Sequence, residues 1–208
     1  MKPINLYRIV TAVLAGMLVV TLYTKNSSNN MSNISQKDAV LENIHSRKSV
    51  RKYAEKPVSK EDLLTLVQAG MASPSSKNVQ PWSFIIVTEK SVMDIMAEQL
   101  PYAKMLKTAP AAIVVCGDMS KVDDPAKSLW YLDCAMASQN ILLAAEAMGL
   151  GAVYTAAYPY EDRVKAVSIS LSLPATVIPL CVIPIGYGDG SEKPKDKWKP
   201  ENIKWEKW

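Results

Sequence analysis

Residues 132–148 constrain the fold more than any other part of this 208-residue chain. The segment has helical character, and its apolar side chains spread around most of the circumference of that helix, namely Ala135, Met136, Leu142, Leu143 and Ala147. A helix that is apolar nearly all round must be buried on all sides. In a chain of this size, the simplest burial is the centre of a homodimer, so we expect this helix to meet a second copy of the chain.

The rest of the chain predicts helices alternating with strands, without internal repeats. Helices are expected at 36–44, 59–71, 91–99 and 161–167, and strands at 83–87, 111–116, 152–155 and 177–186. Ser59 followed three residues later by Asp62 is typical of a helix start. Strands mixed with helices in this way indicate a three-layer α+β fold.

The composition excludes several classes of function. A formal charge of +4, without a basic run interleaved with aromatics, argues against nucleic-acid binding. Cys116, Cys134 and Cys181 lie far apart in apolar runs, which predicts buried, inert thiols rather than a disulfide framework. The chain has one histidine, His45, so neither a histidine-based metal site nor a Ser/His triad is expected, and we predict no metal ligands.

The N-terminus predicts membrane targeting. An apolar segment begins at Ile4 and ends at Tyr23, and a helix of about 20 residues spans roughly 30 Å, the thickness of a bilayer core. No small-residue cleavage site follows, which favours an uncleaved signal anchor over a removable signal peptide. We therefore expect a leader and linker at 1–30, a folded domain at 31–208, and a membrane-anchored or exported protein. The alternative is a cytoplasmic protein whose translation starts at Met31.

Two short motifs carry the chemistry. The first, residues 47–53, reads Arg-Lys-Ser-Val-Arg-Lys-Tyr and packs cations and a hydroxyl into one segment, as phosphate recognition requires. The second, residues 74–82, is a Pro/Ser/Asn turn that leads into an apolar strand, and such a turn can offer amide donors to a planar heterocycle. Alone, the first could be a solvated basic turn and the second a helix stop. Together and in this order, they resemble the flavin-binding signatures of the nitroreductase family.

The resemblance implies a three-layer α-β-α fold with a mixed, mainly antiparallel sheet, and a C-terminal tail exchanged between the subunits of a homodimer. It also implies an FMN site. Arg47 and Ser49 correspond to the residues that hold the phosphate and ribityl end, while Lys48 and Arg51 correspond to further flavin contacts. A cation such as Arg51 near the N1/O2 edge would stabilise the reduced flavin, where negative charge develops.

Other parts of the chain resemble the rest of that site. The second motif resembles a segment that, in the family, comes from the opposite subunit and lies against the isoalloxazine; the corresponding residues here are Pro74, Ser75, Ser76 and Asn78. A basic pair near the C-terminus, Lys195 and Lys197, resembles one that closes on the phosphate, although the family usually has arginine at the second position.

The strand and loop along the flavin correspond to Thr155, Ala156 and Ala157, and the N–H of Ala156 or Ala157 is expected to bond flavin N5. Some relatives carry an acidic residue and a glycine there, and this chain has neither. Lys104 is a further candidate for the pyrimidine edge. The tail after residue 189 contains Trp198, Trp205 and Trp208, whose apolar area predicts packing on a partner subunit.

The resemblance implies an FMN-dependent oxidoreductase with NADH or NADPH as electron donor and a small electron-poor acceptor such as a nitroaromatic or quinone. No side chain need act as a nucleophile, because the flavin carries the chemistry. Two alternatives stay open. One is the same site used for another redox reaction, such as dehalogenation or dehydrogenation. The other is a membrane-tethered, non-catalytic flavin-binding or redox-sensing module. The S-x-x-K pattern that begins at Ser49 lacks the S-D-N and K-T-G partners of a serine hydrolase.

Overall fold

The computed structural model describes residues 17, 35–123 and 128–208, in two compact units that divide between Glu42 and Asn43. Helix α2 (Gln36–Ser46) contains that division. The predicted leader lies outside the described residues, Met17 excepted. Within the described part of the chain, no helix has the combined length and apolarity needed to cross a membrane.

The second unit is built around a five-stranded sheet with the order β1-β2-β5-β3, in which β4 also pairs with β5. The strands are β1 (Trp82–Val87), β2 (Ala111–Asp118), β3 (Gly151–Ala152), β4 (Thr155–Ala156) and β5 (Val177–Gly186). Each of these pairings is antiparallel, and a parallel component comes from an isolated bridge between Ser49 and Ala152. The predicted mixed, mainly antiparallel sheet is therefore confirmed.

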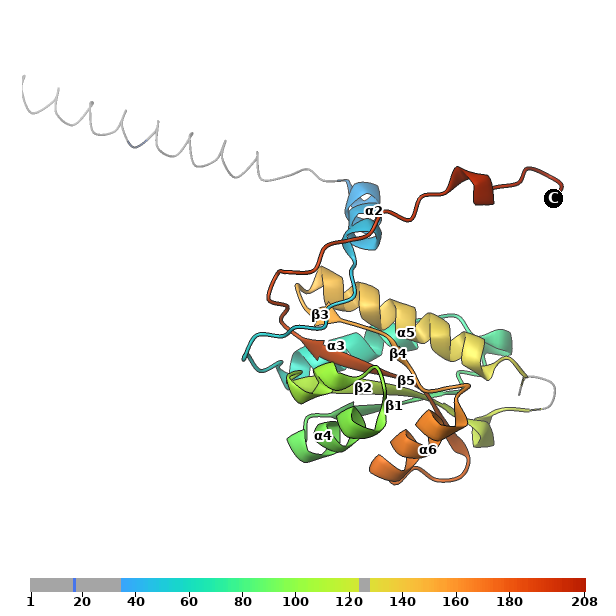
Figure 1. Cartoon of the computed structure of the whole chain (residues 1–208). Coiled ribbons are helices and arrows are strands. Elements are labelled where there is room, and N and C mark those ends of the chain that lie inside the picture. The colour runs from blue at the N-terminus through green and yellow to red at the C-terminus, as the bar shows by residue number, and fades with distance from the viewer. Residues whose placement is uncertain (1–16, 18–34, 124–127) are drawn as a thin grey trace, which may run out of the picture. The chain divides into compact units, whose positions relative to one another are not determined.

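Helices cover both faces of the sheet, which gives the expected three layers (Figure 1). Helices α3 (Lys60–Met71) and α5 (Trp130–Ala147) lie on one face, and α4 (Lys90–Gln99) and α6 (Glu161–Ser170) on the other. Alternation along β2 supplies both cores: Ile113 and Val115 pack with α3 and α5, while Ala112 and Val114 pack with α4 and α6.

Local signals explain where the two longer helices begin and end. Ser59 caps α3, and its Oγ accepts a hydrogen bond from the N–H of Asp62 at 3.0 Å. Gly149 follows α5 with φ of +70°, a left-handed conformation that glycine adopts without steric cost.

The strand predicted at 152–155 is divided into β3 and β4, and the reason lies in β5. Both short strands keep one register, in which Val153 would stand opposite Pro184. Proline has no N–H, and the carbonyl of Pro184 already accepts a hydrogen bond from the Tyr53 hydroxyl at 3.2 Å. The ladder is therefore interrupted at Val153 and Tyr154.

Helix α5 differs from the expectation of burial all round. Cys134, Ala137 and Ile141 are fully buried, but Leu132 is 47% exposed and Met136 is 39% exposed. The three tail tryptophans are 72%, 81% and 102% exposed, so most of their apolar area lies in solvent in the described structure. Burial by a second copy of the chain stays a prediction.

Candidate functional site

The basic segment is held against the edge of the sheet by its own apolar residue. The N–H of Val50 donates to the carbonyl of Ala152 at 3.0 Å, and the Val50 side chain is only 3% exposed. Because side chains alternate along an extended segment, burial of Val50 turns Ser49 and Arg51 the other way. The Tyr53 hydroxyl also donates to the carbonyl of Val50 at 2.8 Å, which fixes the end of the segment.

This arrangement opens a cavity of about 370 Å³ that brings together three of the predicted site residues, Arg47, Ser49 and Arg51. Helix α5 and the interrupted strand complete the lining with Ala135, Gln139, Leu142, Val153 and Tyr154. Two guanidinium groups and a hydroxyl suit a phosphate or a polyol, because arginine can donate two parallel hydrogen bonds to phosphate oxygens.

Lys48 points elsewhere, although the sequence placed it among the flavin contacts. Its Nζ lies 2.9 Å from Oε1 of Glu146 on α5, and it lines a separate cavity of about 200 Å³. The Lys48 side chain thus fastens the segment to α5. A second carboxylate, that of Glu192, accepts a hydrogen bond from the backbone N–H of Arg51 at 2.8 Å.

A larger cavity of about 1030 Å³ adjoins the first, because Arg51, Val153 and Tyr154 line both. It contains the predicted residues Lys104, Thr155 and Ala156. Its further lining residues are Lys52, Tyr53, Pro101, Tyr102, Met105, Thr108, Tyr160 and Arg163. Among the described residues, the lining includes the cations Arg51, Lys52, Lys104 and Arg163 and no carboxylate, so its charge favours an anionic occupant.

The backbone of β4 distinguishes the two alanines predicted to face the flavin. Ala157 is fully buried, and its N–H donates to the carbonyl of Leu180 at 2.9 Å. Backbone groups alternate between the two sides of a strand, so the N–H and carbonyl of Ala156 point away from β5. The Ala156 carbonyl accepts a long hydrogen bond from Nη1 of Arg163 at 3.4 Å, which agrees with this direction. The outward N–H therefore belongs to Ala156.

The turn after Pro74 lines neither of these cavities. Helix α5 anchors it, because the buried carboxylate of Asp133 accepts a hydrogen bond from the N–H of Ser76 at 3.0 Å. The Ser75 hydroxyl accepts another from the N–H of Gln80 at 3.0 Å, and Asn78 has a positive φ of 56°. The structure thus fixes the shape of this turn but does not bring it to the rest of the predicted site.

The basic pair of the tail lies beside the first motif. Lys195 and Lys197 line a cavity of about 480 Å³ together with Arg47, His45 and Trp198. Arg47 therefore belongs to this cavity as well as to the one it shares with Ser49, so the structure brings Arg47, Lys195 and Lys197 to one region.

The cysteines take no part in the site. All three are buried free thiols, as expected. Burial raises the pKa of Cys116 to about 12 and that of Cys181 to about 12, and it also raises the pKa of Cys134. A thiol in this state is a poor nucleophile, since the thiolate is the reactive form.

Sequence reasoning missed the aromatic wall of the large cavity and the arginine beside it. Tyr102 follows α4, Tyr160 precedes α6, and Arg163 is in the first turn of α6. A basic residue in a first turn that otherwise carries Glu161 and Asp162 opposes the helix dipole, which is the only local signal that it is unusual.

Comparison with known proteins assigns the chain to a class. The model of the nitroreductase family matches residues 44–100 and 92–187. "Putative NADH dehydrogenase/NAD(P)H nitroreductase" from Methanothermobacter thermautotrophicus is 44% identical over 169 residues, which cover 81% of this chain and 87% of that relative. The chain belongs to the nitroreductase family.

Solved structures agree with this assignment. A crystal structure of the same name from Parabacteroides distasonis is 53% identical with a TM-score of 0.78, and the match covers 81% of this chain and 98% of that one. A "putative nitroreductase in complex with fmn" from Desulfovibrio desulfuricans is 27% identical with a TM-score of 0.70, and the match covers 81% and 97% of the two chains.

Proposed function

We propose that this protein is an FMN-dependent oxidoreductase that passes a hydride from NADH or NADPH to a small electron-poor acceptor, such as a nitroaromatic or a quinone. The observation that carries the proposal is the pair of adjoining cavities joined at Arg51 and Tyr154. One offers donors suited to a phosphate and ribityl chain, and the other offers a broad apolar and aromatic space. The name of the solved relative with FMN supports the same cofactor.

The residues present fit this cofactor. Arg47 and Ser49 would hold the phosphate and ribityl end, with Lys195 and Lys197 closing from the tail. Arg51 stands where the two cavities meet and would approach the pyrimidine edge, with Lys104 in the same cavity. Cavities of a few hundred to a thousand Å³ are the usual size for such ligands.

FMN, when bound, supplies the hydride-accepting and hydride-donating chemistry. The chain would orient the FMN and stabilise its reduced form. The outward N–H of Ala156 is our proposed donor to flavin N5, because the N–H of Ala157 is occupied by Leu180. Arg51 would stabilise negative charge on the reduced ring, and the apolar side chains of the large cavity would exclude water.

A homodimer is part of the proposal. Within the described residues, α5 has exposed apolar side chains, the tail tryptophans are largely exposed, and the turn after Pro74 lines neither of the two adjoining cavities. Pairing two copies through α5 would bury the apolar side chains of α5 and give the tail tryptophans a surface to pack on. It would also allow the turn after Pro74 to reach the partner's flavin. The leader at 1–30 and the flavin-binding domain at 31–208 complete the proposed organisation.

The visible spectrum of the purified protein tests the proposal. We expect flavin absorption bands, either as purified or after addition of FMN, that bleach under anaerobic conditions with NADH or NADPH and return when a quinone is added. Bound flavin that resists both nucleotides would contradict the proposed reaction. The lack of flavin binding even after addition of FMN would contradict the site itself.

A further inference from the structure

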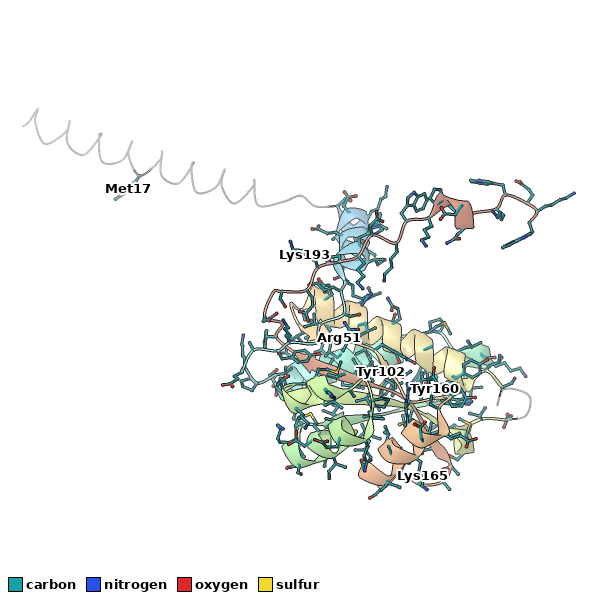
Figure 2. All side chains as sticks on the ribbon, viewed as in Figure 1. Met17, Arg51, Tyr102, Tyr160, Lys165 and Lys193 are labelled. Carbon is teal, nitrogen blue, oxygen red and sulfur yellow. The ribbon has the colours of Figure 1, made fainter. Side chains whose placement is uncertain are left out.

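Arg163, in the lining of the large cavity, occupies an unusual environment. Its Cζ lies 3.8 Å from the ring centroid of Tyr160 and 5.5 Å from that of Tyr102 (Figure 2 labels both tyrosines). A guanidinium against aromatic faces is held by the ring quadrupole, which fixes its plane without using its N–H groups. The cation is thus positioned by stacking, and its donors stay available.

Those donors are poorly satisfied. A guanidinium has five N–H groups, and the only hydrogen bond found for this one within the described residues is the 3.4 Å contact with the Ala156 carbonyl. Its Nε is buried and has no hydrogen-bond partner in the part of the chain that the structure describes. No ion pair to Arg163 occurs among the described residues, although Glu161 and Asp162 are close in sequence. A buried donor without an acceptor is costly, so an incoming oxygen would be stabilised here.

The surroundings specify what kind of molecule brings that oxygen. Lys104 lines the same cavity, and none of its described lining residues carries a carboxylate. Tyr102 is 72% exposed, so its ring can turn toward solvent with little loss of packing and uncover the guanidinium. Arg163 also bonds the carbonyl of Ala156, whose N–H we assign to flavin N5, so an anion on Arg163 would lie beside the reactive part of the ring.

We propose that Arg163 binds the carboxylate or phosphate of the molecule that exchanges electrons with the flavin, so that the site selects anionic aromatic partners. This inference rests on the proposed function and adds a specificity-determining residue to it. The anion has two sources: an acidic substituent on the acceptor, or a phosphate of the nicotinamide nucleotide. The planar donor edge of arginine suits either group.

A matched pair of acceptors separates charge from shape. 4-Nitrobenzoate and 4-nitrobenzamide have nearly the same size and differ in charge. The reaction followed is NADH + H⁺ + nitro compound → NAD⁺ + nitroso compound + H₂O, in which a hydride and a proton are consumed and one N–O bond breaks. Calorimetric binding of both compounds to the flavin-loaded protein supplies a readout besides turnover.

The variant to test is Arg163→Gln, with Lys165→Gln as its control. Lys165 is an exposed cation on the same helix, outside the cavity lining (Figure 2). We expect the wild type and Lys165→Gln to bind 4-nitrobenzoate at least about tenfold more tightly than the amide, and Arg163→Gln to bind both alike, since bonds to charged groups are the stronger ones. Anaerobic bleaching by NADH should stay unchanged in Lys165→Gln. If that variant does not fold, Arg163→Lys, which keeps the charge but loses the planar edge, should reduce the preference.

The nucleotide arm identifies the second source. A preference for NADPH over NADH in the wild type, lost in Arg163→Gln, would support the site with a nucleotide phosphate as its anion. An Arg163→Gln protein that matches the wild type in both comparisons overturns the inference, as does a wild type without preference in either. The proposed function is judged separately by the flavin spectrum, and its failure would remove the inference as well.

Discussion

Substitution of Gly151 by alanine should weaken FMN binding, although Gly151 lines neither of the two cavities proposed for the flavin. A Cβ at this position would lie 2.5 Å from Cγ1 and 2.7 Å from Cβ of Val50. Carbon atoms in contact lie about 3.5–4.0 Å apart, so Val50 must move by about 1 Å. Val50 is buried and hydrogen-bonded to Ala152, so its displacement carries the segment with Arg47, Ser49 and Arg51 away from the cavity.

The expected magnitudes come from that displacement. Overpacking costs about 1–3 kcal/mol of the free energy of unfolding, and removal of a glycine returns about 0.4–1 kcal/mol through the unfolded chain. A net loss of about 1–2 kcal/mol lowers Tm by about 2–4 °C per kcal/mol in a chain of this size. Loss of one charge-assisted hydrogen bond to the phosphate, about 1.5–3 kcal/mol, raises the Kd for FMN by about tenfold or more.

The assay is a titration of FMN fluorescence beside a thermal melt, with Gly70→Ala as the control. A Cβ at Gly70 would lie 3.0 Å from Cγ1 of Ile141, between α3 and α5, so this variant overpacks the core away from the basic segment. It should lower Tm and leave the Kd for FMN unchanged. A Gly151→Ala protein with the wild-type Kd and Tm would show that the contact with Val50 does not position the cations.

Three further outcomes are expected. Arg47→Ala should raise the Kd for FMN by about tenfold or more without lowering Tm. Lys48→Ala, which breaks the ion pair with Glu146, should lower Tm and leave the Kd for FMN unchanged. Two variants with the same effects on Kd and Tm would contradict these separate roles. Ala156→Pro, which deletes the outward N–H, should slow flavin bleaching in a folded protein, and bleaching at the wild-type rate would exclude the Ala156 N–H. Ala157→Pro, which deletes the hydrogen bond to the Leu180 carbonyl, should instead lower Tm. Burial raises the pKa of Cys116 and of Cys181 from 9.0 to about 12, so above pH 9 these thiols ionise in the unfolded chain before they do in the folded one. The free energy of unfolding, measured with urea, should therefore fall as the pH rises from 9 toward about 12, and it should fall less steeply in Cys116→Ala.

The sequence predicts the fold because its local signals agree with its periodicity. The cap at Ser59, the glycine after α5 and the apolar run of β5 each place an element boundary within a few residues. The strand at 152–155 was predicted as continuous because its interruption depends on Pro184, which lies about thirty residues further along the chain. Such a non-local cause leaves no mark on the strand that it interrupts.

The candidate site was predicted less completely, for a similar reason. The motif at 47–53 predicts a cluster of cations but not the direction of each side chain. Lys48 turns away from Arg47 and Arg51 because Val50 is buried and Glu146 pairs with Lys48. Stacking of Arg163 with tyrosines from two different loops depends on tertiary structure alone. The turn after Pro74 needs a second copy of the chain to complete its proposed role.

The short length of β4 has a consequence for solubility. It is a two-residue strand at the margin of the sheet, where a longer strand would present a row of unpaired donors and acceptors to any passing chain. Because the strand is interrupted opposite Pro184, β4 has too few outward N–H and carbonyl groups to pair with another strand. The single outward N–H of Ala156 is still enough for the hydrogen bond that we propose to flavin N5. The shortness of β4 should thus limit edge-to-edge aggregation while it leaves the Ala156 N–H, our proposed donor to flavin N5, pointing away from β5.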